Sequence, residues 1–257
     1  DDHIGALPYV LAQLPAPVYG SRLTLALLRA KLAEHDLPSG IELIELHYRT
    51  PQAIGAHFEI LPIHVTHSIP DTLALGIQTP AGVIIHTGDY KIDYSPVSGE
   101  PFDFHTLTQL GEAGVLALVG DSTNAIESGA THTERWVAEG LGPIFASSPK
   151  AIFCSTFSTS IHRVQILMDL AVRMGRKIFV VGRSLERNTA IASEFGYLQV
   201  PERHRADIQD IESFSPSERL IIATGSQGEP MSVMSRLALG DYSRVEVEEG
   251  DTVILSA

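Results

Sequence analysis

Cysteine is almost absent from the sequence: Cys154 is the single one, so no disulfide can form within the chain. One thiol suits a reducing compartment such as the cytoplasm, and it leaves the chemistry of any site to histidine and carboxylate groups. Long apolar runs are missing too. Segments such as 83–86 and 116–119 have the length of buried strands and are far too short to span a bilayer. We therefore expect a cytoplasmic protein without a membrane-spanning segment.

The sequence also lacks the glycine-rich loops of common nucleotide sites, since neither Gly-x-Gly-x-x-Gly nor Gly-x4-Gly-Lys-Ser/Thr occurs. A nucleotide-binding or scaffolding domain therefore has no motif support. Basic residues are few, 18 against 31 acidic ones, and the net charge of −13 taken alone argues against nucleic-acid binding. However, residues 150–187 hold seven basic and two acidic residues. This segment fits either a phosphate-bearing ligand or a solvated helix face, and composition leaves both open.

Apolar residues, at 44%, are numerous enough for a substantial core in one or two domains. In the first part of the chain, apolar residues at helical spacing predict helices over 4–14 and 22–33. Strand patterns then predict an antiparallel meander, with a tight turn at 79–82 and strands over 41–46, 58–65, 72–78 and 83–86.

After residue 90, short apolar strands alternate with helices, which predicts a parallel sheet covered on both faces. The predicted strands are 115–119, 151–154, 177–181, 220–223 and 252–255. The predicted helices are 104–111, 133–141, 160–174, 185–195 and 231–239. The predicted fold class is therefore α/β. We expect a first domain over 1–114, a second over 115–240, and a last strand within 241–257 that returns to the first domain.

Histidine and aspartate occur at four places where a fold would expose their side chains. Asp2 and His3 stand immediately before an amphipathic helix. His67, Asp89 and Asp121 each follow an apolar strand, which is where α/β scaffolds present functional groups. Imidazole and carboxylate suit Zn²⁺ or Mn²⁺, and a pair of such ions about 3.5–4 Å apart can act on a phosphodiester. Taken singly, a lone histidine is more often a hydrogen-bonded structural residue, and Asp121 a turn or cap residue.

Seven segments extend this pattern. Residues 2–9 read Asp-His-Ile-Gly-Ala-Leu-Pro-Tyr, residues 67–71 His-Ser-Ile-Pro-Asp, and residues 86–91 His-Thr-Gly-Asp-Tyr-Lys. The other four segments are 120–124, 156–163, 182–184 and 223–230. Together, and in this order, they resemble the motifs of the ribonuclease J family, metallo-β-lactamase-type nucleases with an inserted β-CASP domain. The first resembles the end of the His-x-His-x-Asp-His metal signature, the next two the third and fourth motifs, and 120–124 the first β-CASP motif.

The resemblance implies a fold and a metal site. The fold would be a partial metallo-β-lactamase domain of the αββα type over 1–114, a β-CASP domain over 115–240, and a strand that returns to the first domain. The cofactors would be two divalent ions, Zn²⁺ with Mn²⁺ or Mg²⁺ as alternatives. Asp2 and His3 would bind one ion, His67 the other, and Asp89 would bridge both. Asp121 would not be a ligand; with Asp2 and Asp89 it would belong to the catalytic residues, as the acid that orients a later histidine.

The implied activity is hydrolysis of RNA phosphodiesters by a metal-activated hydroxide, in RNA processing and decay. The enzyme would degrade single-stranded, 5′-monophosphorylated RNA from 5′ to 3′ and would also cut internally, and its full-length form would be a homo-oligomer without membrane contact. Ser158, Ser160, His162 and Arg183 would hold a phosphate near helix amino termini. In the alternative interpretation, Ser158 or Ser160 only caps the helix while His162 and Arg163 face solvent. Residues 225–228 are a second backbone-rich candidate for the phosphate.

Two other activities stay open at this point: a β-CASP nuclease that acts on DNA, and a metallo-hydrolase of small molecules. The resemblance further implies that the chain is truncated at both ends, because it lacks the leading histidines of the metal signature and the later β-CASP histidines. We therefore expect the chain by itself to bind metal poorly and to be inactive.

Overall fold

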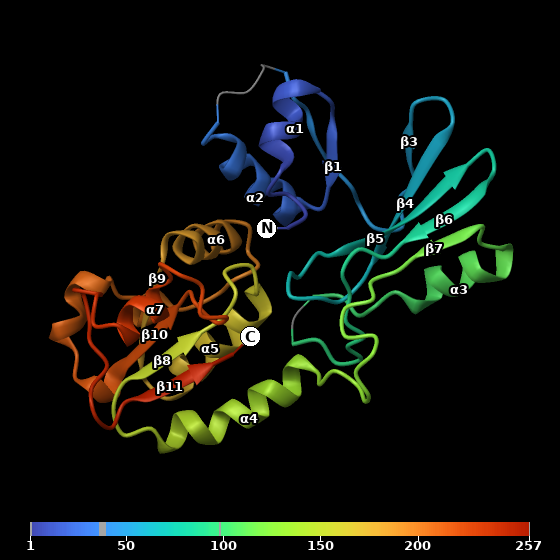
Figure 1. Ribbon diagram of the computed structural model, residues 1–257. Helices are drawn as coiled ribbons and strands as arrows, with labels where there is room; N and C mark the ends of the chain where they lie inside the picture. The colour runs from blue at the N-terminus through green and yellow to red at the C-terminus, as the bar shows by residue number, and fades with distance from the viewer. Residues whose placement is uncertain (1, 36–39, 98, 257) are drawn as a thin grey trace. The chain divides into compact units, whose positions relative to one another are not determined.

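The computed structural model describes residues 2–35, 40–97 and 99–256 (Figure 1). They form two compact units that divide between Thr133 and Glu134, named here the first unit and the second unit. Each unit is built around a sheet of its own. Within the described residues, no helix combines the length and the apolar character that crossing a bilayer would require.

The first unit begins with an N-terminal helical segment, residues 2–35 and 40–46. Its elements are α1 (Leu7–Gln13), β1 (Val18–Gly20), α2 (Arg22–Leu32) and β2 (Leu43–Glu45). α2 forms because leucines recur along its inner face, where Leu23 and Leu28 are buried. β2 pairs in parallel with β1. The expectation that this strand joins the meander is wrong, because its partner β1 is too short to show a period in the sequence.

A five-stranded sheet follows in the first unit. Its strands are hydrogen-bonded in the order β3 (Gln52–Ile54), β4 (Phe58–His64), β5 (Leu73–Thr79), β6 (Gly82–His86) and β7 (Ala117–Val119). β4 to β6 form the predicted antiparallel meander, and β3 adds an edge strand that the pattern did not predict. Thr79 closes the predicted turn: its Oγ1 accepts from the Ala81 N–H at 3.1 Å and donates to the Gly82 carbonyl at 2.8 Å.

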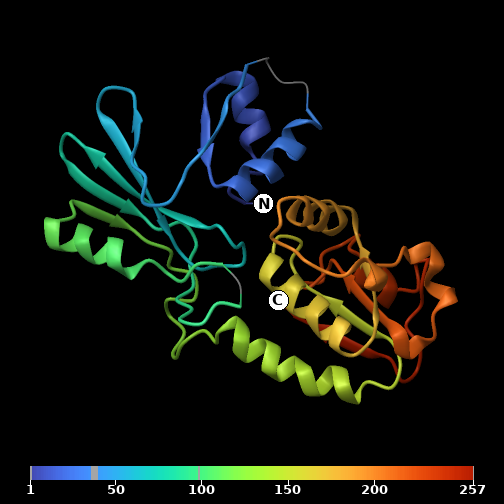
Figure 2. The ribbon, with the colours of Figure 1, turned by 180° about the vertical axis from the view of Figure 1, so that it is seen from behind.

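β7 returns to this sheet after a crossover helix, α3 (Phe104–Ala113), and pairs in parallel with β6. α3 lies along one face of the sheet (Figure 2). There Leu110 approaches so closely that a Cβ at Gly76 would meet its Cδ1 at 3.0 Å. The expectation that strand 115–119 belongs to the second domain is wrong, because β7 pairs with β6 in the first unit. The units divide after β7, between Thr133 and Glu134, rather than at 114/115.

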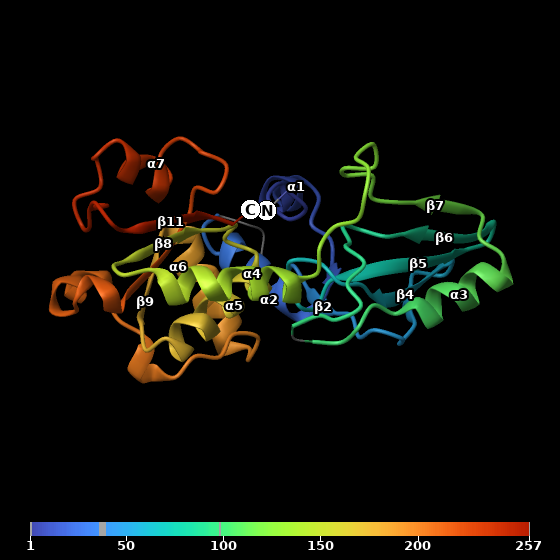
Figure 3. The same ribbon diagram turned by 90° about the horizontal axis from the view of Figure 1, so that it is seen from below.

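The second unit is a four-stranded parallel sheet with helices on both sides. Its strands, in spatial order, are β11 (Thr252–Leu255), β8 (Ile152–Ser155), β10 (Arg219–Ala223) and β9 (Lys177–Val181). Its helices are α4 (Glu134–Ser147), α5 (Ile161–Arg173), α6 (Arg183–Glu194), α7 (Val233–Ala238) and the short 3-10 helices η1 (Glu202–His204), η2 (Ile208–Ser213) and η3 (Pro216–Glu218). Figure 3 shows α7 on one side of the sheet and α5 on the other. The predicted α/β class with a helix-flanked parallel sheet is confirmed.

The pairing of β11 corrects a third expectation about the strands. It pairs with β8 along its whole length, from Thr252↔Ile152 to Leu255↔Ser155. The expectation that this last strand returns to the first domain is wrong, because β8 offers it a parallel edge within the second unit. The core on the α7 side is formed by Phe153, Phe179 and Ile221, which pack against α7 and η2.

Asp103 holds the start of α3 and makes the stability of the first unit depend on pH. Its carboxylate accepts from the Thr106 N–H at 3.1 Å and from Arg49 Nε and a terminal nitrogen of the same guanidinium at 2.9 and 2.8 Å. The Arg49 hydrogen bonds, assisted by Thr106, hold the pKa of Asp103 well below its usual range. The ion pair therefore contributes stability that is present above the unfolded pKa of about 4, and that is lost as the pH falls towards the lower folded pKa.

We expect Asp103→Ala to lower the free energy of unfolding by about 2 kcal/mol at pH 7, because a helix cap and a bidentate ion pair are both removed. At pH 2 to 3 the variant and the wild type should differ less. Urea unfolding at the two pH values measures this. The matched control is Glu59→Gln, an exposed carboxylate on β4 of the same unit. A difference that stays constant over the two pH values would contradict the linkage.

Candidate functional site

The predicted residues of the first unit gather at one edge of its sheet. β4 and β6 both run antiparallel to β5, and β7 runs parallel to β6, so the carboxyl ends of β4, β6 and β7 lie at the same edge. His67, Asp89 and Asp121 each follow one of these ends. Alternating direction within the meander thus places side chains from three separate loops at one edge.

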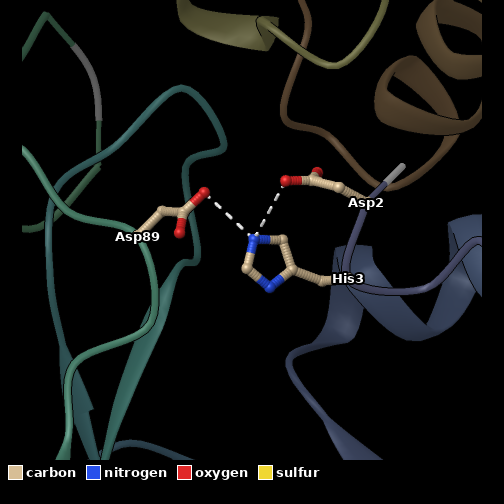
Figure 4. Close-up of side chains that lie close together, drawn as sticks. All are labelled: Asp2, His3 and Asp89. Carbon is tan, nitrogen blue, oxygen red and sulfur yellow. Dashed lines mark hydrogen bonds and ion pairs between the residues drawn. The ribbon is translucent and has the colours of Figure 1, made fainter. Parts of the chain in front are cut away.

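Asp2 and His3 come to this edge from the helical segment. His3 Nε2 lies 3.0 Å from Asp89 Oδ2 and 3.5 Å from Asp2 Oδ2 (Figure 4). One donor atom from each of the three residues lies within 4.8 Å of the others. The side chains remain accessible, with exposed fractions of 84% for Asp2, 58% for His3 and 39% for Asp89. The structure therefore brings together three of the four predicted metal ligands.

Two carboxylates that face one imidazole nitrogen favour a cation between them. A hydrogen bond of the Asp2 side chain to its own backbone and, more weakly, the charge of His3 hold the pKa of Asp2 below its usual value, so its carboxylate is ionised at neutral pH. A nitrogen donor with two carboxylate oxygens is a ligand set that Zn²⁺ and Mn²⁺ accept. The residues present therefore fit the predicted divalent ion.

His67, the fourth predicted ligand, lies outside this cluster of three but close enough to interact electrostatically with Asp89 and His3. Burial lowers the pKa of His67, while the carboxylates of Asp89 and Asp121 act in the opposite direction. A lowered pKa favours the neutral imidazole, which is the form that binds metals. Its Nδ1 lies 3.3 Å from the hydroxyl oxygen of the neighbouring Ser68.

Two threonines that the sequence analysis missed tie the loops of this edge together. Thr66 donates its hydroxyl to the Lys91 carbonyl, and the Lys91 N–H donates to the Thr66 carbonyl at 2.7 Å. Thr87 Oγ1 accepts from the Asp121 N–H at 2.9 Å, and the Thr87 N–H donates to the Val119 carbonyl at 3.0 Å. The sequence signal that could have identified them is their position, because Thr66 directly precedes His67 and Thr87 lies two residues before Asp89. The loops after β4, β6 and β7 therefore form one hydrogen-bonded group.

Asp121 organises its own loop. Its carboxylate accepts from the Thr123 N–H at 2.8 Å. Hydrogen bonds from Thr123, and a further one from the backbone of Tyr90, hold the pKa of Asp121 below its usual value. The contact with Tyr90 places this ionised carboxylate beside the loop that carries Asp89. Such a group can orient a neighbouring donor without itself lying in the cluster of Asp2, His3 and Asp89.

The residues predicted to hold a phosphate lie in the second unit. Ser158 and Ser160 follow the carboxyl end of β8, and Arg183 follows that of β9 as the first residue of α6. Because the strands are parallel, these turns share one edge of the sheet. Ser160 stands at the N-cap of α5 without a side-chain hydrogen bond to the helix, so the interpretation that it serves as a side-chain cap does not hold. Ser158 is held by Asn188, whose side-chain amide donates to the Ser158 carbonyl at 3.1 Å.

His162 differs from the other three predicted phosphate residues. Ser158, Ser160 and Arg183 are accessible to solvent, whereas His162 is 5% exposed. The alternative interpretation, in which it faces solvent, is therefore wrong. It is wrong for Arg163 as well, because this side chain is 12% exposed and forms a bidentate pair with Glu134 at 2.9 and 3.1 Å. Two buried hydroxyls at the end of β8, Ser155 Oγ and Thr156 Oγ1, have no hydrogen-bond partner among the described residues.

Comparisons with known proteins decide the family. Residues 149–257 match the family described as "Ribonuclease J, beta-CASP domain". The ribonuclease J of Helicobacter pylori strain J99 is 42% identical over the whole chain, which covers 37% of that protein. The chain belongs to the ribonuclease J family. The ribonuclease J proteins of Thermus thermophilus and of a Synechocystis strain are each 40% identical over the whole chain, which covers 46% and 40% of them.

The ribonuclease J similarity spans less than half the length of these relatives. A solved structure from Enterococcus faecalis V583, described as a protein of unknown function, superposes with a TM-score of 0.63 at 13% identity. The superposition covers 94% of this chain and 64% of the other. At this identity the likeness concerns the fold alone.

Proposed function

We propose that the full-length protein containing this chain is a metal-dependent ribonuclease that hydrolyses RNA phosphodiesters. The observation that carries the proposal is the meeting of Asp2, His3 and Asp89, which come from segments 86 positions apart and face one another with metal-binding atoms. Asp2 and His3 would hold one divalent ion, His67 a second, and Asp89 would lie between them. When bound, such ions generate a hydroxide nucleophile at neutral pH and stabilise the oxygens of the phosphodiester. Asp121, through its hydrogen bonds, would keep the loop of Asp89 in place.

The proposed substrate is single-stranded RNA with a 5′-monophosphate, degraded from 5′ to 3′ and also cut internally. The relatives are named ribonuclease J, which supports RNA as the polymer. Ser158, Ser160 and Arg183 would hold a phosphate, since the amino ends of α5 and α6 favour an anion and a guanidinium can bind a phosphate with two hydrogen bonds. The buried hydroxyls of Ser155 and Thr156 would be satisfied by a polar ligand at the same edge. His162 would support the turn from within.

In cells, the proposed roles are processing of rRNA and decay of mRNA in the cytoplasm, by a homo-oligomer. Zn²⁺ is the proposed resident ion, with Mn²⁺ or Mg²⁺ as alternatives. We expect the chain by itself to bind metal poorly, because the cluster found among the described residues offers three ligand residues for what would be two ions.

The decisive experiment measures RNA hydrolysis after metal has been removed and again after it has been restored. The full-length protein is stripped with a chelator and incubated with 5′-monophosphorylated RNA, 5′-hydroxyl RNA and single-stranded DNA of one sequence. We expect mononucleotide release from the first substrate when Zn²⁺ or Mn²⁺ is restored, almost none without metal, and none from residues 1–257 alone. Full activity after chelation would refute the metal centre. Hydrolysis of DNA in preference to RNA would assign the protein to the DNA-directed nucleases of the same superfamily, and hydrolysis of neither would point to a small-molecule substrate.

A further inference from the structure

Asp71 joins two parts of the first unit that are distant in sequence. It ends the predicted motif His-Ser-Ile-Pro-Asp, in the loop after β4, and its Oδ2 accepts from the Leu23 N–H at 2.7 Å. Leu23 lies in the first turn of α2. The local N-cap residue, Ser21, does not cap the backbone amides of the helix with its side chain. Its hydroxyl instead donates to the side-chain oxygen Oγ1 of Thr24, in the first turn, at 2.9 Å. A residue 48 positions away therefore caps α2.

The hydrogen bond between Asp71 and Leu23 links the two segments that supply candidate metal ligands, namely the helical segment of Asp2 and His3 and the loop of His67. On one side, α2 contacts α1, and Asp2 and His3 precede α1 in the same helical segment (Figure 1). On the other side, Asp71 shares a loop with His67. That loop is fixed to the sheet: buried His64 contacts the Pro70 carbonyl through Nε2 at 3.1 Å and the Pro101 carbonyl through Nδ1 at 3.0 Å.

The hydrogen bond between the Asp71 carboxylate and the Leu23 N–H resists movement of the loop relative to α2. A carboxylate at a helix amino terminus is stabilised by the free amides and by the helix dipole. Asp71 Oδ1 is buried, so water does not replace these interactions when the carboxylate moves. A shift of the loop relative to α2 would therefore break a charge-assisted hydrogen bond in a partly buried place. Metal ligands have to hold their distances to within about 0.2 Å, so such a fixed spacing matters for binding.

We propose that Asp71 is a positioning residue, which sets the distance between the Asp2–His3 pair and the loops that carry His67 and Asp89. This inference rests on the metal centre of the proposed function and adds a determinant of its geometry. Asp71 touches no ion in this scheme. It acts through α2 and through its own loop.

The test measures Mn²⁺ affinity of the metal-stripped full-length protein by titration calorimetry, together with the melting temperature of the metal-free form. We expect Asp71→Ala to weaken Mn²⁺ binding roughly 10–100-fold, the usual effect of losing a residue that orients ligands. Asp71→Asn should bind nearly as well as the wild type, since asparagine caps helices about as well as aspartate and its amide oxygen has the same reach. Asp71→Glu keeps the charge but lengthens the side chain, and it should bind Mn²⁺ about tenfold more weakly while melting close to the wild type.

Two matched variants separate positioning from stability. Asp103→Ala destabilises the same unit at α3 and should melt lower without losing Mn²⁺ affinity. Ser21→Ala, at the N-cap that forms no such bond, should change neither quantity. Wild-type affinity in both Asp71→Ala and Asp71→Glu would overturn the inference, and so would equal losses in Asp71→Asn and Asp71→Glu. If the wild type itself binds neither Mn²⁺ nor Zn²⁺, the metal centre fails and the inference fails with it.

Discussion

Asp89→Ala is expected to reduce RNA hydrolysis by the full-length protein at least ~1,000-fold in kcat/KM, a loss of about 4 kcal/mol of transition-state stabilisation. The carboxylate of Asp89 lies 3.0 Å from His3 Nε2, and it is the group proposed to lie between two ions. Its removal would leave the Asp2–His3 pair and His67 without a shared ligand. Because the side chain is 39% exposed, its loss should leave the fold intact.

Three measurements check the Asp89 prediction: kcat/KM on 5′-monophosphorylated RNA, bound metal per protein by elemental analysis, and the melting temperature. Activity and metal content should fall together while the melting temperature of the metal-free protein stays close to that of the wild type. Glu112→Gln, an exposed carboxylate on α3, is the matched control and should retain both. A variant that keeps a tenth or more of the wild-type rate would remove Asp89 from the site.

The positions of His67 and Asp89 could be predicted from sequence because they depend on local signals, whereas the position of Asp121 also depends on which sheet β7 joins. Each follows a short apolar strand, and strand ends are visible as a change from apolar residues to glycine, threonine or proline. That these strand ends share an edge follows from the direction of the strands, which the tight turn at Thr79–Gly82 fixes for β5 and β6. Local chemistry thus determined most of this edge.

The partners of short strands could not be predicted in the same way. β7 is three residues of apolar sequence, and the same pattern suits either sheet. Its place depends on α3, which carries the chain across the sheet and returns it parallel to β6. The partners of β2 and β11 could not be predicted either, because long-range packing determines that they pair with β1 and β8. The contact of Asp71 with Leu23 spans 48 residues, and in the sequence Asp71 is only an aspartate after a proline.

Arg176→Met is expected to cause the largest loss of stability, about 3 kcal/mol or more from the second unit. Arg176 is 4% exposed. Its guanidinium donates to the carbonyls of Ser148, Lys150 and Arg219 at 2.7, 2.8 and 3.2 Å. Burial lowers the pKa of this group, and the three carbonyl acceptors oppose that effect because they stabilise the charged guanidinium. Methionine would fill the space but would remove the donor of all three carbonyls, of which the hydrogen bond to Ser148 is buried and the other two are partly buried.

Arg176 lies at the opposite edge of the sheet from the residues proposed to bind RNA, so its substitution should lower stability without changing activity. It joins the amino ends of β8, β9 and β10, whereas Ser158, Ser160 and Arg183 follow carboxyl ends at the opposite edge of the sheet.

Urea unfolding of residues 1–257, followed by the fluorescence of the single tryptophan, Trp136 in α4, reports on this unit. Arg176→Lys should recover only part of the loss, because one ammonium cannot span acceptors that a planar guanidinium reaches together. Exposed Arg173→Met is the control and should stay within about 0.5 kcal/mol of the wild type. In the full-length protein, at a temperature where Arg176→Met is folded, kcat/KM should be unchanged; a loss of activity there would mean that the amino edge of the sheet communicates with the RNA site.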